Sequence, residues 1–514
     1  MSGEEESTSV GLVSVQENKA LPQTASVLTS EGVLTPVKAL VGQKVAIFGL
    51  NGKPAVTQAR RVCETQGKVH LIITRKGHRA LVPTNAAVLR FDGRSLQRTP
   101  TVKVCKDDFI VIPRWYPFER PPLNLIEPLK RLPNLRVTNI SYYSAMIDAL
   151  EKVKGTGTIR GLAQQLGTTP SNIRSYRVRR TFPPASFLAS IAIPMTQFKK
   201  ETASTPTFLP SLITPELAEF LGLLLSDGFL RKNQVVFCNN NPILQTRFTS
   251  LAKYLFGLDA VEIRQPTVLT SVLYSSVLWD YLVSMGVPQN KKSRTVQIPE
   301  ELLRMGIEFL LPFLNGYIAG DGHISSNGVE IATSSEEMVK ELGIVLLKLG
   351  LIHRFSSRVI KGHRRWRIFV EGQEKRKLAA YLGQATLYPK TFAIKQYAKV
   401  VKKRRYASDV IPIAPELLEV DPASINPDQR VNFFRARKDV RAGSNISPPR
   451  LDYFLQVISP TNPNYASLKV IRDHLTYFHF DRVEHNSPVE ESQILSILDL
   501  KEPIFLIGEF NFLV

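Results

Sequence analysis

The chain has 514 residues, of which 43% are hydrophobic, and its 66 Lys and Arg residues outnumber its 45 Asp and Glu residues to give a formal net charge of +21. A chain of this length is expected to divide into about two to four domains, and its hydrophobic content excludes disorder over the whole length. So large a basic surplus predicts a polyanionic partner, most often nucleic acid. The alternative is a basic surface that only keeps the protein dispersed.

The cysteines and the amino terminus indicate in which cellular compartment the protein is found. Cys63, Cys105 and Cys238 are scattered, with no CxxC pair, which fits a reducing cytosol and excludes a disulfide framework. The first residues lack the basic and then apolar pattern of a signal peptide, and no apolar run approaches the length of a membrane span. We therefore expect an intracellular, cytoplasmic protein with no membrane partner.

The amino-terminal part of the chain is expected to be all-β. Residues 1–19 are polar and acidic, which predicts a disordered lead-in. Residues 20–125 contain short apolar runs separated by turn residues, the pattern of a domain built from many strands. Three of these runs are residues 44–52, 69–74 and 109–113.

A helical pattern follows. The segment Thr158–Arg177 spaces its apolar residues like two short helices joined at Gly167, where the turn needs a permissive backbone, and Ser171 is the expected cap of the second helix. The pattern resembles a helix-turn-helix, whose second helix would expose Arg174 and Arg177 to DNA. An ordinary helical hairpin with a basic, solvated face is the alternative.

The remaining domain boundaries are predicted from the local amino-acid composition. A stretch rich in Pro, Ser and Thr predicts a linker after the helical segment, and an alternation of helix and strand patterns then occurs twice. A Pro-rich segment beyond it predicts an extended connection with some helix, before short strands return. The expected parts are a helical DNA-recognition module with its linker at 126–205, the repeated α+β segment at 206–405, the connecting segment at 406–470 and a β segment at 471–514.

Two segments of the repeated region match each other. Residues 220–228 (FLGLLLSDG) and 314–322 (LNGYIAGDG) each carry a Gly inside an apolar helix pattern and end in Asp-Gly, with Asp227 and Asp321 in the same position. Gly inside a helix costs about 1 kcal/mol relative to Ala. Close backbone approach of two helices would compensate for this cost. If the helices pack side by side, both acids emerge together at their carboxyl ends.

That placement of the two acids predicts a metal site. Helix carboxyl ends are negative, and two carboxylates placed there repel each other. A divalent cation would resolve the conflict, and oxygen ligands favour Mg²⁺. Metal ions beside two acids can stabilise the attacking and leaving oxygens of phosphodiester hydrolysis. The alternative is that each Asp-Gly only ends its helix in a turn, which two matching copies make harder to sustain.

The paired segments resemble the motifs of the LAGLIDADG homing endonucleases, over residues 210–400. The resemblance implies two αββαββα halves that form a saddle on a long, asymmetric double-stranded DNA site, in a monomer with Mg²⁺ as cofactor and Mn²⁺ as a substitute. It also implies catalytic roles for Asp227, Asp321 and Lys292. Lys361 and His363 are the candidates for the basic residue of the second half. The implied metal site consists of Asp227, Asp321, Ser226 and Gly320.

DNA contacts are expected from the sheets of the saddle. Arg365 and Arg367 alternate with Trp366 and Ile368, which predicts a strand with its basic side chains outward and its apolar side chains toward the core. Arg, Lys and Gln are the side chains that recognise guanine and adenine edges. The alternative is a solvated sheet face. The other expected contacts are Arg231, Lys232, Gln234, Arg264, Lys361 and Arg364.

The β-rich ends of the chain resemble the two parts of an intein's splicing (Hint) domain. Splicing needs a nucleophile at the first residue, and that position here is Ala20. The family's Thr-x-x-His motif is expected at Thr84–Ala87, where Ala replaces His; His78 is the rival, although a surface His there needs no special role. The family ends in His-Asn, whereas this sequence ends Leu513-Val514. These departures predict that splicing is lost.

The sequence therefore predicts an α+β multidomain protein. A pseudo-twofold αββαββα saddle is expected inside a split, all-β Hint-like domain, with a small helix-turn-helix-like module beside it. The predicted function is that of a freestanding homing endonuclease, a metal-dependent enzyme that cuts both strands of a specific site. Two rivals remain: a self-splicing intein that carries an endonuclease, and a DNA-binding regulator or RNA maturase that uses the saddle without cutting.

Overall fold

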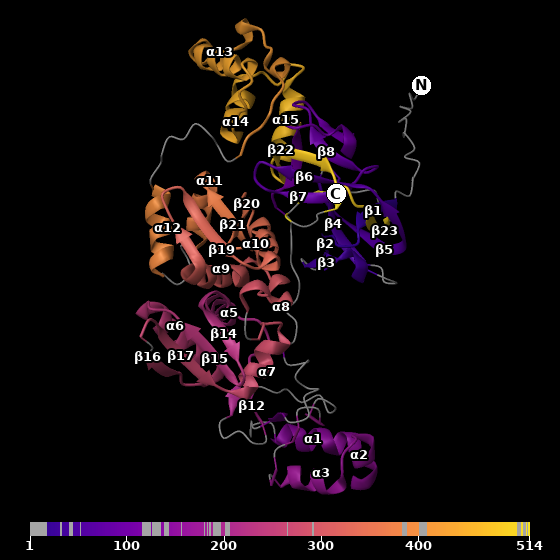
Figure 1. Cartoon of the computed structure of the whole chain (residues 1–514), viewed down its shortest axis with the longest axis vertical. Coiled ribbons are helices and arrows are strands. Elements are labelled where there is room, and N and C mark those ends of the chain that lie inside the picture. Colours follow the sequence, from indigo (N-terminus) through magenta and orange to yellow (C-terminus); the bar gives the residue numbers. More distant parts are fainter. Residues whose placement is uncertain are drawn as a thin grey trace, which may run out of the picture. The chain divides into compact units, whose positions relative to one another are not determined.

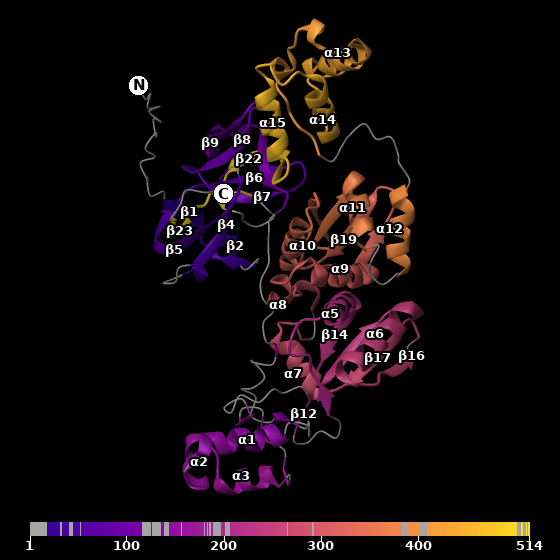
Figure 2. The same ribbon diagram turned by 180° about the vertical axis from the view of Figure 1, so that it is seen from behind.

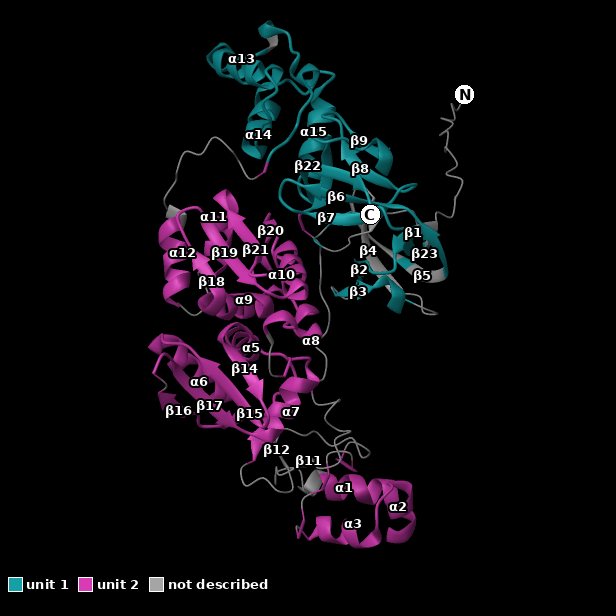
Figure 3. Cartoon of the chain, viewed as in Figure 1, with its two compact units in different colours: residues 1–113, 410–514 teal, residues 114–409 magenta. Residues whose placement is uncertain are grey.

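The chain divides into two compact units, which Figure 3 shows in different colours: residues 1–113 with 410–514 form the first, and residues 114–409 form the second. The structure is a computed structural model, and each unit is described by itself. The described residues are 18–30, 33–40, 45–51, 53–115, 125, 135–137, 143–155, 157–178, 180–181, 183–184, 187–188, 197–200, 206–264, 266–289, 292–382, 388–399, 409–500, 505–506, 510 and 512–513.

The first unit is built mainly of antiparallel strands. A five-stranded sheet has the order β1-β23-β5-β4-β24, and a six-stranded sheet has the order β7-β6-β22-β10-β8-β9. The strands are β1 (Asn18–Pro22), β4 (Val45–Asn51), β5 (Lys53–Gly67), β6 (Val69–Thr74), β7 (Arg79–Pro83), β8 (Ala87–Phe91), β9 (Leu96–Pro100), β10 (Phe109–Pro113), β22 (Phe478–Pro488), β23 (Gln493–Leu500) and β24 (Phe505–Leu506), together with the hairpin β2 (Ser26–Leu28) and β3 (Leu34–Pro36).

The two ends of the chain pair with each other in both sheets. In the five-stranded sheet β23 lies between β1 and β5, and Ala20 is opposite Ile497. In the six-stranded sheet β22 lies between β6 and β10, with Val111 opposite Phe480. The second unit is therefore an insertion in the sequence of the first, because residues 114–409 separate strands that pair directly.

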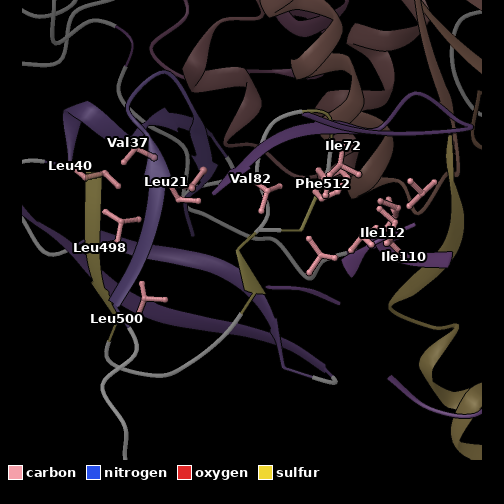
Figure 4. Close-up of a cluster of buried hydrophobic side chains, with 14 residues drawn as sticks. Leu21, Val37, Leu40, Ile72, Val82, Ile110, Ile112, Leu498, Leu500 and Phe512 are labelled. Atoms are coloured by element: carbon pink, nitrogen blue, oxygen red, sulfur yellow. The ribbon is translucent and has the colours of Figure 1, made fainter. Parts of the chain in front are cut away.

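A common hydrophobic core joins these two ends (Figure 4). Leu21, Val82 and Ile112 come from the amino-terminal segment, and Leu498 and Phe512 come from the carboxyl-terminal segment; each is at most 1% exposed. Burial of large aliphatic side chains of this kind stabilises a fold by about 1.5–3 kcal/mol each. The amino-terminal strands would lack part of their core without the last residues of the chain.

Residues 427–474 are more helical than the sequence predicted. Three helices, α13 (Pro427–Arg441), α14 (Pro448–Val457) and α15 (Tyr465–His474), occupy most of the segment expected to be an extended connection. The prolines favoured an extended prediction, but Pro427 and Pro448 do not interrupt helices. They lie in the first turns of α13 and α14, where a missing N–H is tolerated. The Phe433 and Phe454 rings pack edge to face, with centroids 5.5 Å apart, between α13 and α14.

The second unit begins with the helical module. Its described helices are α1 (Tyr143–Lys154), α2 (Ile159–Gln165) and α3 (Pro170–Arg177). Gly167 has a φ of +60°, as the predicted turn requires. The predicted cap is wrong by two residues: Thr169 caps α3 by accepting from the Asn172 amide at 3.1 Å, and Ser171 lies inside the first turn. Thr169 is the cap because Pro170 at the first helical position already fixes where the helix starts.

Part of the predicted linker forms strands. β12 (Gln197–Lys200) pairs with β11 (Leu135–Val137) on one side and with β13 (Thr207–Phe208) on the other. β12 is thus the middle strand of a small three-stranded sheet, which local composition did not reveal because β11 lies more than fifty residues earlier in the sequence.

Two copies of one αββαββα unit make up most of the rest of the second unit, with the short helix α8 (Glu300–Leu303) between them (Figures 1 and 2). Their sheets have the equivalent orders β14-β15-β17-β16 and β18-β19-β21-β20. The mixed α+β fold predicted from the sequence is confirmed. The first copy consists of α5 (Pro215–Asp227), β14 (Gly228–Arg231), β15 (Gln234–Cys238), α6 (Pro242–Phe256), β16 (Val261–Arg264), β17 (Leu269–Tyr274) and α7 (Ser276–Ser284). The second consists of α9 (Ile307–Asp321), β18 (Gly322–Ile324), β19 (Gly328–Thr333), α10 (Glu336–Lys348), β20 (Arg354–Ile360), β21 (His363–Glu371) and α11 (Gly372–Leu382), and α12 (Pro389–Lys399) follows it.

No helix in the described part of the chain is long and apolar enough to cross a membrane.

Candidate active site

The helices that carry the repeated motif, α5 and α9, lie side by side and touch along their backbones (Figure 1). A Cβ atom on Gly222 would lie 2.2 Å from the Phe313 carbonyl oxygen, and one on Gly316 would lie 2.7 Å from the Glu219 carbonyl oxygen. Both distances are too short for any side chain, so only glycine permits this contact. The close approach predicted from the two mid-helix glycines is confirmed.

Asp227 and Asp321 are the last residues of α5 and α9. Asp227 is half-buried and Asp321 is exposed. The Asp227 Oδ2 atom lies 2.6 Å from the position that a Cβ on Gly320 would occupy, so it reaches the neighbour of Asp321. The two carboxylates therefore share one site at the carboxyl ends of the paired helices, where the helix dipoles add to their repulsion.

Different groups hold the two carboxylates. The Asn239 side chain donates to Asp227 Oδ2 at 2.7 Å. The residue equivalent to Asn239 in the second copy is Thr333, and it hydrogen-bonds the Tyr317 hydroxyl, which also hydrogen-bonds Asp321. Burial and the negative charge of Asp321 raise the pKa of Tyr317 well above its ordinary value, so that its hydroxyl stays neutral and can donate. Asn239 and Tyr317 were not predicted as site residues.

A lysine that the sequence patterns did not single out lies beside both acids. The Lys390 ammonium, at the start of α12, donates to the Gly320 carbonyl oxygen. Burial lowers its pKa, and attraction to Asp227 and Asp321 offsets part of this effect. Lys390 therefore places a positive charge close to the two carboxylates. Its position in the sequence carried a signal, because it follows Asp321 at nearly the same spacing as Lys292 follows Asp227.

The structure does not bring Lys361 or His363 to the carboxylates. Gly322, next to Asp321, is opposite Ile331, which is opposite Ile368, so the acid is level with Ile368 in the sheet. Lys361 lies seven residues further along, in the turn between β20 and β21, which is about 20 Å away at ~3.3 Å per residue.

The predicted catalytic lysine of the first copy is described only in part. The backbone of Lys292 begins the short 3-10 turn Lys292–Arg294, and its side chain lies outside the described residues. Just before it, Gln289 forms a parallel bridge with Leu230, three residues beyond Asp227. The loop that leads to Lys292 therefore approaches the end of the first motif.

The donor atoms at the site suit a hard divalent cation. Asp227 and Asp321 supply carboxylate oxygens, and magnesium prefers oxygen ligands and retains several waters. The described residues hold no group of three or more His, Cys, Asp or Glu side chains that could bind a metal. Ser226 donates its hydroxyl to Leu223 O at 2.9 Å, and the Gly320 carbonyl accepts from Lys390, so these two predicted ligands already have partners.

The second sheet presents a basic face. Arg365 lies directly opposite Arg358, and Arg367 lies opposite Ser356 and Ala332. These residues share the face turned away from the buried Trp366, which is 3% exposed, so the predicted alternation is confirmed. Like charges directly opposite each other destabilise a sheet, which favours a polyanion on this face.

The other residues of the second copy that were predicted to contact DNA lie on different faces of the sheet or have partners within the chain. Arg364 lies on the same face as Trp366, with its guanidinium 5.4 Å from that ring, and thus on the face opposite Arg365. Arg367 is paired with Glu330 at 3.2 Å. Lys361 is exposed at the hairpin turn, and His363 next to it contacts the Arg294 guanidinium at 2.9 Å.

In the first copy the predicted contacts cluster at one hairpin. Arg231 is opposite Gln234, which is opposite the exposed Tyr274, so the three share one face of the sheet. Lys232 is exposed in the turn of the same hairpin. Arg264 stands apart on the edge strand β16, opposite Leu269, and strand alternation directs it to the other face.

In the helical module, Arg174 is exposed on α3, as predicted. Arg177 is half-buried and paired with Glu151 of α1 at 2.6 Å, which partly satisfies its charge inside the module.

The expectation that His78 is a surface histidine is wrong. It is 1% exposed, its ring nitrogen Nδ1 lies 2.8 Å from the Phe510 carbonyl oxygen, and its amide donates to the Thr74 hydroxyl at 3.1 Å. Burial lowers the pKa of His78 to about 4. Thr74 and His78 thus form a buried Thr–His pair. Three residues separate them, one more than in Thr-x-x-His, and Gly77 in the turn between them has a φ of +80°.

Comparison with known proteins identifies one family within the chain: residues 308–383 match the LAGLIDADG-like domain. They begin in α9 and end after α11, and so contain the second motif and its sheet. Among solved structures, a mesophilic variant of the homing endonuclease I-DmoI is similar over 36% of this chain and 98% of its own, with 14% identity and a TM-score of 0.29. Other I-DmoI structures hold DNA with Ca, or target DNA with Mn or Mg.

Two curated relatives show where similar sequences occur. An A-type ATP synthase subunit from Pyrococcus abyssi is 34% identical over 32% of this chain and 16% of its own length. The replication factor C small subunit of Methanocaldococcus jannaschii is 28% identical over 46% of this chain and 12% of its own. This chain therefore spans less than a fifth of either relative.

Proposed function

We propose that the chain is a site-specific homing endonuclease that hydrolyses both strands of double-stranded DNA with Asp227, Asp321 and Mg²⁺. One observation carries the proposal: two motif helices in backbone contact end side by side in Asp-Gly, next to Lys390. A site of this kind needs no accumulation of acids, because the DNA phosphates supply the remaining oxygen ligands. The LAGLIDADG-like domain at residues 308–383 supports the same class of enzyme.

Asp227 and Asp321 would hold the metal, with Mn²⁺ as a substitute, and the backbone oxygen of Ser226 would add to the protein's share of the site, whereas the Gly320 carbonyl oxygen accepts from Lys390 instead. The bound cation would polarise the scissile phosphate and stabilise the charge that develops on its oxygens. Asn239 and Tyr317 hold the carboxylates in place through the hydrogen bonds described above. Lys390 and the predicted Lys292 add positive charge near the phosphate, one from each half.

The DNA is proposed to lie on the faces of the two sheets that carry Arg365 and Arg231. Because both copies belong to one chain, a monomer suffices, and because the two faces differ in sequence, the target site is expected to be asymmetric. Arg174 of the helical module would add a contact outside the saddle. Arginine and glutamine at such positions recognise guanine and adenine edges, and lysines contact phosphates.

The first unit is proposed to be a Hint-like splicing fold. Sequences similar to this chain occur in one component of an ATP synthase and in one component of a replication factor, proteins of different function, as expected of an inserted mobile element. Ala20 lies in β1 with no side-chain nucleophile, so acyl transfer cannot begin on this residue. We propose that splicing activity is lost. The buried Thr74–His78 pair favours a second candidate, an element that retains part of the splicing chemistry.

The test of the endonuclease is cleavage of a randomised DNA library in Mg²⁺ by the wild type and by Asp227→Asn and Asp321→Asn. Each substitution removes one charge and keeps the size of the side chain. We expect specific double-strand cleavage by the wild type, loss of it in both variants, retained binding, and inhibition by EDTA that Mg²⁺ reverses. Asp473→Asn, the same change at an exposed position of α15, is the matched control. Wild-type rates in both variants, or specific binding without cleavage in Mg²⁺ or Mn²⁺, would refute the proposal and favour a regulator or maturase.

The test of splicing is incubation with thiols followed by mass spectrometry. We expect an intact chain. Scission at residue 20 or excision of the segment that follows it would show that the second candidate is correct.

A further inference from the structure

Two polar residues are buried in the apolar motif helices. Glu219 of α5 is 4% exposed and Asn315 of α9 is fully buried. The residues at the equivalent positions of the other copy, Phe313 and Leu221, are apolar and fully buried. A buried polar group costs stability unless it is hydrogen-bonded, so the hydrogen-bond partners of Glu219 and Asn315 explain why they are present.

One hydrogen-bond partner of each residue lies at the start of α12, and Glu219 has a second partner, Arg247 of α6. The Tyr388 hydroxyl donates to Glu219 Oε1, and Arg247 donates to the same carboxylate through Nε at 3.1 Å and through a second nitrogen at 2.5 Å. The Thr391 hydroxyl donates to Asn315 Oδ1 at 2.5 Å. Tyr388 and Thr391 are both fully buried. The first turn of α12 is thus bonded to α5 on one side of Lys390 and to α9 on the other.

We infer that Tyr388 and Thr391 are positioning residues, which hold Lys390 against the two carboxylates through their bonds to Glu219 and Asn315. These two bonds are called the α12 clamp. Only the catalytic consequence of the clamp rests on the proposed function. A lysine side chain has about 2 kcal/mol of rotamer entropy, so a fixed backbone beneath it favours the one arrangement in which its ammonium reaches the Gly320 carbonyl.

The clamp serves one half of the molecule. The two polar residues that anchor it have apolar equivalents, so nothing of the same kind links the motif helices to the first copy at those positions. Loosening it is therefore expected to affect the DNA strand that Lys390 serves and to spare the other.

Two substitutions loosen the clamp and keep the buried volume: Tyr388→Phe and Thr391→Val. Tyr281→Phe is the matched control, because Tyr281 is also fully buried and donates to a single acceptor, the Pro210 carbonyl oxygen at 2.8 Å, in the first copy. It loses one buried hydrogen bond of a tyrosine without touching α12.

The first measurement is independent of cleavage. The ε-amine of Lys390 is acylated in the full-length chain without DNA at one fixed pH, and the modified peptide is quantified by mass spectrometry. We expect both clamp variants to raise the acylation rate, because the ammonium that the clamp holds against the Gly320 carbonyl oxygen becomes more accessible to the reagent. The control should match the wild type. An unchanged rate in both variants would overturn the inference.

The second measurement is strand-resolved cleavage of the target in Mg²⁺. We expect the clamp variants to cut one strand roughly 10- to 100-fold more slowly, to accumulate nicked DNA, and to bind DNA as the wild type does. Equal slowing of both strands, with the nicked product absent, would show that the clamp is only structural. If acylation changes as expected while the wild type cuts no DNA, the clamp is supported and the proposed function is refuted.

Discussion

The side-chain amide of Asn239 donates to the Asp227 carboxylate at 2.7 Å, whereas Thr333, its equivalent in the other copy, hydrogen-bonds the Tyr317 hydroxyl, which in turn hydrogen-bonds Asp321. The two acids that the repeat makes equivalent are therefore held by different groups. A direct amide fixes one carboxylate, and a buried phenol fixes the other. In the proposed endonuclease, this asymmetry would give each strand of the DNA its own set of supporting residues.

Asn239→Ala and Tyr317→Phe are expected to slow opposite strands. Each substitution leaves one carboxylate without a donor that orients it, and misplacement by about 1 Å can cost ~100-fold in rate. Gel separation of the two labelled strands should show nicked intermediates in both variants, with the nick in one strand for Asn239→Ala and in the other strand for Tyr317→Phe. Tyr281→Phe again serves as the control for a buried phenol. Nicks in the same strand for both variants would contradict the assignment.

Gly222→Ala is expected to destabilise the second unit. A Cβ there would lie 2.2 Å from the Phe313 carbonyl oxygen, and overpacking of this kind costs about 1–3 kcal/mol, which exceeds the ~1 kcal/mol that Ala gains in a helix. All tryptophans, Trp115, Trp279 and Trp366, belong to the second unit, so their fluorescence during urea unfolding reports on it. Gly161→Ala, whose Cβ would have no neighbour nearer than 3.7 Å, should be neutral or stabilising. A stable Gly222→Ala chain would mean that the helices can separate at no cost.

The motif helices could be predicted from the sequence because the signal is local and occurs twice. A mid-helix glycine, an apolar face and a terminal Asp-Gly are visible in each copy, and their contact follows from packing. Asn239 could not be predicted this way, because its contact with Asp227 depends on how β15 pairs with β14. Lys390 was missed for the same reason. Its placement depends on the docking of α12 on both motif helices, although its spacing from Asp321 was a usable signal.

The buried Thr–His pair of the first unit could not be predicted from a fixed Thr-x-x-His spacing. Thr74 and His78 are separated by three residues rather than two, and the intervening turn, with Gly77 in the left-handed region, brings the His78 amide to the Thr74 hydroxyl. Three-dimensional proximity identifies the pair, and the strand pairing that buries it joins segments from opposite ends of the sequence.

Arg174→Ala is expected to weaken DNA binding and to lower its salt dependence. Each phosphate contact contributes about −0.9 to the slope of log K against log salt concentration, so loss of one contact should reduce the slope by roughly that amount. Titrations at several salt concentrations measure it. Arg435→Ala, an exposed arginine of α13 in the first unit, is the control. An unchanged slope for Arg174→Ala would show that the helical module is structural.

The first unit is expected to lose stability as the pH falls below neutrality, because of His78. Its pKa is lowered by burial to about 4 in the folded chain, against ~6.5 when unfolded. At pH 7 the imidazole is mostly neutral in both states and contributes little pH dependence. Between pH 6.5 and 4 the unfolded chain binds a proton that the folded chain does not, so stability falls by about 1.4 kcal/mol per pH unit and by roughly 3 kcal/mol in total.

Hydrogen exchange of the β6 and β22 amides, corrected for intrinsic rates, measures this loss in the first unit alone. In the variant His78→Gln, the buried bond to the Phe510 carbonyl is altered, so the protection of these amides should be lower than in the wild type at pH 7. Because glutamine cannot take up a proton, the protection in this variant should change less between pH 7 and 4. The titratable and charged groups facing His78 are Asp481, which attracts its protonated form, and Lys76, which repels it, with His479 at a ring distance of 5.7 Å. Protection that falls equally in the wild type and in His78→Gln would assign the acid sensitivity to those neighbours instead.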